Sequence, residues 1–182
     1  YIGDWSSDVC SSDLSHFTST HSTGVANSAY KLSLFMGFDL ETARKMYLAG
    51  ALHDIGKIAI KNDILEKPAR LTEKEYANMK DHAWYTYKLL HQVAGFEEIT
   101  RWASLHHEKL DGSGYPFGYT AEQLGVNERM MACVDIYQAL TEDRPYKSGM
   151  TKEKTFAIMR DMVAHNWIDG DITEQLIMCF GE

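Results

Sequence analysis

Two pairs of adjacent residues in this sequence have side chains that could bind metal ions. His53-Asp54 follows an apolar stretch and offers one neutral nitrogen ligand beside one anionic oxygen ligand. His106-His107 offers two imidazoles at the start of a glycine-rich stretch. Adjacent residues on a helix point about 100° apart, so these two rings could serve two different metals. Either pair alone is also compatible with a histidine that binds nothing.

Three further residues are expected to point into the protein. His82 lies three residues after an apolar methionine, and His21 lies four residues before an apolar valine. Both spacings place two side chains on one helix face. Asp135 lies in an apolar helical run, where an unpaired carboxylate is costly to bury. The alternatives are core histidines with ordinary hydrogen bonds and a salt bridge from Asp135 to a Lys or Arg.

Taken together, these five histidines and two aspartates lie on inner faces or at helix ends, and helical bundles build metal sites from such residues. Nitrogen and carboxylate ligands without cysteine suit iron, manganese, nickel, cobalt or zinc.

The elements that must position these residues are predicted to be helices, because apolar residues recur with helical spacing between polar or glycine-rich segments. Asp39, Thr151 and the pair Thr72 and Glu75 are expected helix caps. A loop containing Pro68 is expected before the third helix. The expected helices cover residues 17–38, 40–53, 72–94, 97–107, 126–140, 151–165 and 173 onward, with a loop over 108–119. The sequence therefore predicts an all-α fold.

The first fourteen residues differ from everything that follows. Residues 4–14 read DWSSDVCSSDL, which resembles the in-frame translation of a common sequencing adapter. The alternative is a flexible linker rich in Ser and Asp. We expect residues 1–14 to be non-native and residues 15–182 to form one domain, with whatever preceded it missing.

Composition then limits the classes of partner. The whole sequence has a net charge of −8, from 18 basic and 26 acidic residues. Three of the acids lie in residues 4–14, which leaves 23 acids and a net charge of −5. A mildly acidic domain is a poor candidate for nonspecific binding of a nucleic-acid polymer. The sequence contains no run of eighteen apolar residues, so it predicts no membrane span. Outside the first segment, Cys133 and Cys179 give no disulfide framework, which favours a cytoplasmic protein.

The ordered set His21, His53-Asp54, His82, His106-His107 and Asp135 resembles the HD-domain hydrolases. The string HHEKLDGSGYP is similar to the HHExxDGxGYP motif of the HD-GYP group, and LHDIGK and DRPYK also resemble family stretches. The resemblance covers residues 15–182, which would then form one catalytic domain whose upstream sensor region is missing. It implies an HD-domain helical bundle with a metal centre in its core and hydrolysis of cyclic di-GMP to the linear dinucleotide, with further hydrolysis to GMP in some members.

The resemblance also implies roles for individual residues. The metal ligands would be His21, His53, Asp54, His82, His106, His107 and Asp135. Asp54 would bridge two divalent ions, with iron or manganese expected first, and two cations roughly 3.5–4 Å apart can clamp a phosphodiester for in-line attack. Lys57 matches the active-site lysine, and Arg144 and Lys147 match residues that hold phosphate. Without that resemblance, Arg144 and Lys147 would be interpreted as a solvated turn.

Two features stay open at this point. Tyr115, in the Gly112–Pro116 loop, could stack on a guanine, contact a partner such as a cyclase domain, or cover the site. Family members with a third metal carry a Glu four residues before the first histidine, where this sequence has Phe17. A phenyl ring cannot coordinate a cation, so two metals are expected.

The rival functions are hydrolysis of another cyclic dinucleotide, such as cyclic GMP-AMP, and a catalytically silent binding module. The sequence does not indicate the oligomeric state.

Overall fold

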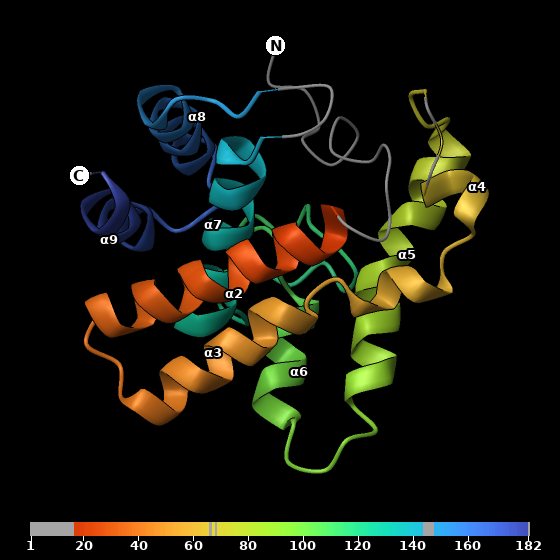
Figure 1. Ribbon diagram of the computed structural model, residues 1–182, viewed down its shortest axis with the longest axis horizontal. Coiled ribbons are helices and arrows are strands. Elements are labelled where there is room, and N and C mark those ends of the chain that lie inside the picture. The colour runs from red at the N-terminus through yellow and green to blue at the C-terminus, as the bar shows by residue number, and fades with distance from the viewer. Residues whose placement is uncertain (1–16, 66, 68, 144–147, 182) are drawn as a thin grey trace.

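The protein folds as a bundle of helices around α7 (Figure 1). The computed structural model describes residues 17–65, 67, 69–143 and 148–181, with side chains from Thr20 onward. Its elements are α2 (Phe17–Phe35), α3 (Leu40–Leu52), the 3-10 helix η1 (Ile55–Ala59), α4 (Asn62–Leu65), α5 (Glu73–Leu90), α6 (Glu97–Ser104), α7 (Val126–Thr141), α8 (Lys152–Ala164) and α9 (Gly170–Phe180). These residues contain no β-strand, which confirms the all-α prediction. None of their helices is long and apolar enough to cross a membrane.

The core lies where α7 meets α2, α3, α6, α8 and α9. Met130, Met131 and Val134 of α7 are fully buried in it. Alongside, α2 and α3 pack along each other, as Figure 1 shows. Gly50 of α3 permits this approach, because a Cβ there would lie 2.8 Å from the Cα of Ala26. The α2–α3 pair therefore holds His21 and His53 at a fixed separation.

The predicted helix caps are confirmed. Asp39 accepts a hydrogen bond from the Thr42 N–H at 2.7 Å. Thr72 and Glu75 form the reciprocal capping box at the start of α5. Thr151 accepts a hydrogen bond from a backbone N–H of the first turn of α8. Each cap connects residues three apart, so the sequence alone is enough to locate it.

Several helix boundaries were predicted wrongly. The segment assigned to a loop before α5 contains η1 and α4, which are too short to show a helical period. The first helix ends at Phe35, and Gly37 then takes a left-handed conformation with φ of 81°. α5 ends at Leu90 and α6 at Ser104, both earlier than expected. The last helix begins at Gly170, because Asp169 caps it by accepting the Ile172 N–H.

Candidate metal centre

The His53-Asp54 pair lies in the turn between α3 and η1, and α5 holds that turn in place. The Gly56 N–H donates to Thr86 Oγ1 at 3.0 Å, and the Thr86 hydroxyl donates to the His53 carbonyl at 2.9 Å. A Cβ at Gly56 would lie 1.9 Å from the carbonyl oxygen of His82. Only glycine lets η1 approach α5 this closely, and the approach brings Asp54 beside His82.

Replacing Gly56 with alanine is expected to push η1 away from α5. Backbone atoms rather than a flexible side chain block the new methyl group, so the free energy of unfolding should fall by about 1–3 kcal/mol. Metal content should fall with it. Thermal unfolding and elemental analysis would measure both, with Gly170→Ala as the control, since a Cβ there meets only the Val163 side chain. Wild-type stability and metal content in Gly56→Ala would contradict this account of the turn.

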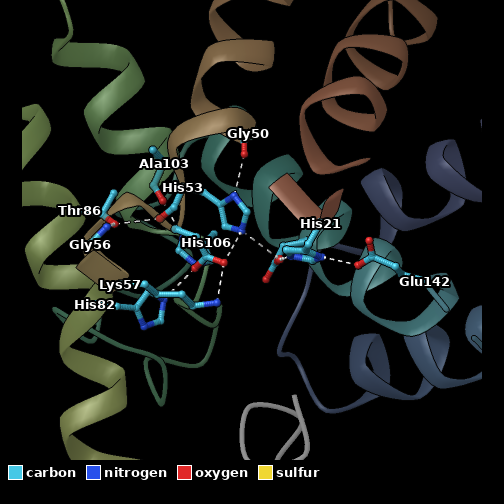
Figure 2. Close-up of polar contacts among 12 residues, drawn as sticks. His21, Gly50, His53, Gly56, Lys57, His82, Thr86, Ala103, His106 and Glu142 are labelled. Atoms are coloured by element: carbon cyan, nitrogen blue, oxygen red, sulfur yellow. Dashed lines mark hydrogen bonds and ion pairs between the residues drawn. The ribbon is translucent and has the colours of Figure 1, made fainter. Parts of the chain in front are cut away.

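Three histidines share one orientation. The Nδ1–H groups of His53, His82 and His106 each donate to the carbonyl three residues earlier, at 2.7, 2.7 and 2.6 Å. Figure 2 shows the carbonyl partners of His53 and His106, which are Gly50 and Ala103. This bond fixes the tautomer and leaves Nε2 with its lone pair directed into the site. Nε2 of His82 and of His106 is buried without a hydrogen-bond partner among the described residues. A buried acceptor without a partner is costly, and a metal ion would satisfy both.

The seven expected ligands gather in the interior as two groups joined by one carboxylate. One group is His82, His106 and His107, and the other is His21, His53 and Asp54, with ligand atoms within 4.8 Å of one another in each. Asp54 Oδ2 lies 3.4 Å from His53 Nε2, and Asp54 Oδ1 lies 3.4 Å from His82 Nε2. Asp54 therefore presents one oxygen to each group, as a bridging ligand must.

Asp135 of α7 completes the second group. Its Oδ1 lies 3.1 Å from His21 Nε2 and 3.5 Å from His53 Nε2. The alternative of a salt bridge from Asp135 to a Lys or Arg does not occur among the described residues, where its ion-pair contacts are histidines.

Helical spacing had suggested that the rings of His106 and His107 point in different directions. The structure instead holds the two rings close together. Because α6 ends at Ser104, both residues follow in a turn, with ring centroids 4.0 Å apart. Both belong to the group that contains His82. The expectation that the two rings serve different metals is therefore not supported.

Burial keeps the first histidine group neutral. It lowers the pKa of His82, and burial together with the nearby His53 lowers the pKa of His106 to about 3. Burial also holds the pKa of His107 well below its usual range. All three imidazoles are thus in the neutral form that binds metal ions.

The second group is charged. Burial would raise the pKa of Asp54, but the adjacent positive charge of Lys57 outweighs it and holds that pKa well below its usual range. Burial would lower the pKa of His21, yet hydrogen bonds to Asp135 and Glu142 raise it to about 9. Burial would raise the pKa of Asp135, but its hydrogen bond to His21 and the neighbouring histidines lower it. The site therefore holds two carboxylates, Asp54 beside the cationic Lys57 and Asp135 beside the cationic His21.

Lys57 and Tyr115 both lie at the centre. Lys57 Nζ donates to Asp54 Oδ2 at 2.7 Å, and its side chain is 23% exposed. The Tyr115 ring stacks on His107, with centroids 4.7 Å apart. Arg144, Lys147 and residues 1–14 lie outside the described residues, as does the Phe17 side chain, so the predictions made for them stay predictions.

Two acidic residues that the sequence analysis missed contact the site or its loop. Glu108 is buried and accepts hydrogen bonds from the backbone N–H groups of Phe117, Gly118 and Tyr119 at 2.7, 3.2 and 3.0 Å. It holds the glycine-rich loop closed, and its place in the motif HHE was the available signal. Glu142 accepts a hydrogen bond from His21 at 3.0 Å. Because 121 residues separate that pair, no local sequence pattern reveals it.

Comparison with known proteins agrees with this geometry. A model of the HD domain family matches residues 5–172. The chain is 36% identical over 163 residues to 3'3'-cGAMP-specific phosphodiesterase 1 of Vibrio cholerae, covering 90% of this chain and 38% of that protein. It is 35% identical over 150 residues to cyclic di-GMP phosphodiesterase PA4108 of Pseudomonas aeruginosa, covering 82% of this chain and 36% of that protein. The chain thus spans little more than a third of the length of these relatives.

Solved structures share the fold. Bd1817, a HDG"Y"P protein from Bdellovibrio bacteriovorus, superposes with a TM-score of 0.73 at 16% identity, covering 91% of this chain and 53% of that one. The HD domain of the L. monocytogenes phosphodiesterase PgpH superposes with a TM-score of 0.66 at 15% identity, covering 89% of this chain and 88% of that one. The family match, the similar sequences and the HHEKLDGSGYP motif agree: the chain belongs to the HD domain family, in its HD-GYP group.

Proposed function

We propose that this chain is a metal-dependent phosphodiesterase that hydrolyses a cyclic dinucleotide, with cyclic di-GMP as the first candidate. The observation that carries the proposal is Asp54, which directs one carboxylate oxygen toward each of two histidine groups. Such an arrangement suits two neighbouring divalent cations. The names of the similar proteins, which are cyclic dinucleotide phosphodiesterases, support this substrate class.

The proposed ligands are the six residues of the two groups together with Asp135, seven in all. Iron or manganese are the first candidates, before nickel, cobalt or zinc. Two cations held there would supply Lewis-acid polarisation of a phosphodiester and activation of water. Lys57 would place a positive charge beside the phosphoryl oxygens, because its Nζ already lies against Asp54. The Tyr115 ring would limit access of water above His107.

The direct test is incubation of the purified chain with cyclic di-GMP under Fe²⁺ or Mn²⁺, with products identified by chromatography. Metal-dependent release of the linear dinucleotide is expected, and EDTA should abolish it. A chain that binds the dinucleotide without cleaving it under either metal would instead support the silent binding module.

3'3'-cGAMP is the second candidate substrate, because similar proteins at comparable identity are named for each dinucleotide. Comparing kcat/KM for the two substrates in one preparation would decide between them. A value at least tenfold higher for 3'3'-cGAMP would reverse the order proposed here.

Arg144 and Lys147 are proposed to hold a substrate phosphate. Replacing either with alanine should raise KM roughly tenfold, as expected for loss of one hydrogen bond to a charged group. The effect should shrink as salt rises, because salt screens exposed charges. Steady-state kinetics at two ionic strengths would measure it, with the exposed Lys154→Ala as control. An unchanged KM in both variants would indicate the solvated turn instead.

The chain is expected to bind two metal ions rather than three. Phe17 stands where family members with a third metal have a carboxylate, so less positive charge would be available for a second phosphate. The second hydrolysis should be slow, and the linear dinucleotide should accumulate. Elemental analysis and a time course of products would test this. Three metals per chain, or GMP as the sole early product, would overturn it.

We further propose that the protein acts in the bacterial cytoplasm and that the Gly112–Pro116 loop is the surface open to a cyclase-domain partner. Glu108 accepts hydrogen bonds from the backbone N–H groups of Phe117 and Tyr119, directly after this loop, and so fixes the end of the loop.

A further inference from the structure

His21 differs from the other oriented histidines in how its ring is held. The rings of His53, His82 and His106 are fixed by a carbonyl of their own helix turn, three residues earlier. His21 is fixed by a side chain from another helix. Its Nδ1 lies 3.0 Å from Glu142 Oε2 (Figure 2). Its Nε2 lies 3.1 Å from Asp135 Oδ1.

α7 presents both of these acceptors. Asp135 and Glu142 are seven residues apart, which is two turns, so they leave α7 on the same side. Glu142 is the C-cap residue of α7, where its backbone N–H donates to the Gln138 carbonyl. The His21 ring therefore lies between two carboxylates of one helix, one on each ring nitrogen.

The two carboxylates have different surroundings. Asp135 Oδ1 also approaches His53 Nε2 and faces the interior of the cluster. The Glu142 side chain is 7% exposed. It lies on the opposite side of the His21 ring from His53 and His106 (Figure 2). Its second oxygen, Oε1, is buried without a hydrogen-bond partner among the described residues. A buried carboxylate with one oxygen unsatisfied is costly, so it needs a reason to be there.

We propose that Glu142 is a positioning residue of the metal centre, which accepts the Nδ1–H of His21 and thereby aims His21 Nε2 at the cation shared with His53 and Asp54. A carboxylate behind a histidine ligand fixes its tautomer and increases its basicity. The helix-turn carbonyls do this for His53, His82 and His106, and Glu142 does it for His21. The proposal deepens the proposed function, because it takes the cluster to hold metal.

The test measures metal binding without substrate. Metal-stripped wild type, Glu142→Gln and Glu142→Ala are titrated with Mn²⁺ by calorimetry, and the two binding steps are fitted separately. For Glu142→Ala, the affinity of one step should fall about 10- to 100-fold, as for loss of other such partners, while the second step stays within about threefold. Glu142→Gln keeps the shape and an acceptor oxygen but lacks the charge. Its metal affinity in that step should therefore lie between those of wild type and Glu142→Ala.

Glu122→Gln is the matched control, because it removes the same charge from an exposed site and should bind both metals like wild type. A purely structural role would lower the melting temperature and leave the affinities unchanged. Affinities within twofold of wild type for both steps in both Glu142 variants would overturn the proposal.

A second measurement needs no variant. Long-range ¹H–¹⁵N NMR spectra of the Zn²⁺-loaded protein should show His21 protonated at Nδ1 and not at Nε2. The opposite tautomer would also overturn the proposal. A chain that shows the expected metal affinities and tautomer but cleaves no cyclic dinucleotide would contradict the proposed function alone, so the two failures can be distinguished.

Discussion

Asp54→Ala is expected to lose at least one metal equivalent and to lower turnover by on the order of a thousandfold or more, since the metals carry several kcal/mol of transition-state stabilisation. The carboxylate is the group that contacts both histidine clusters, through Oδ2 to His53 and Oδ1 to His82. Without it, the two clusters are no longer joined, and the charge that balances two cations falls by one.

Elemental analysis and initial rates would measure the two effects on one preparation. Asp81→Ala is the matched control, because Asp81 is an exposed carboxylate on α5 beside His82. Circular dichroism should show the fold retained in both variants, since the helices around the site are held by the apolar core. Full activity at normal metal content in Asp54→Ala would refute the assignment of the site.

The parts of the fold that depend on short-range patterns could be predicted from the sequence. The Thr72 and Glu75 capping box involves residues three apart, and the inward direction of His82 follows from its spacing to Met79. The η1 and α4 segments could not be predicted, because a helix of four or five residues completes too few turns to show a period.

The candidate site shows the same division. The residue types of its seven proposed ligands stood out in the sequence, and the structure brings all seven together. What could not be predicted are the contacts that aim them, because these join distant segments. Thr86 holds the His53 turn across 33 residues, and Glu142 reaches His21 across 121. Such pairs depend on how α5 and α7 pack, which no local pattern encodes.

Lys57→Ala is expected to lower kcat by about a hundredfold, the effect of removing one donor aimed at developing charge. The lysine is the third of the five residues of η1, with Nζ 2.7 Å from Asp54 Oδ2, so it reaches the position where a phosphoryl group would approach the proposed bridging carboxylate. A charge that meets the transition state more strongly than the ground state changes kcat rather than KM.

Metal analysis separates this role from a structural one. Because lysine is not among the proposed ligands, Lys57→Ala should keep both metals while kcat falls, and Lys57→Arg, which keeps the charge, should recover part of the rate. Lys61→Ala provides the control, as an exposed lysine four residues further along the chain. A rise in KM at constant kcat would make Lys57 a binding residue. Loss of metal in Lys57→Ala would instead mean that its contact with Asp54 serves to hold that carboxylate in place.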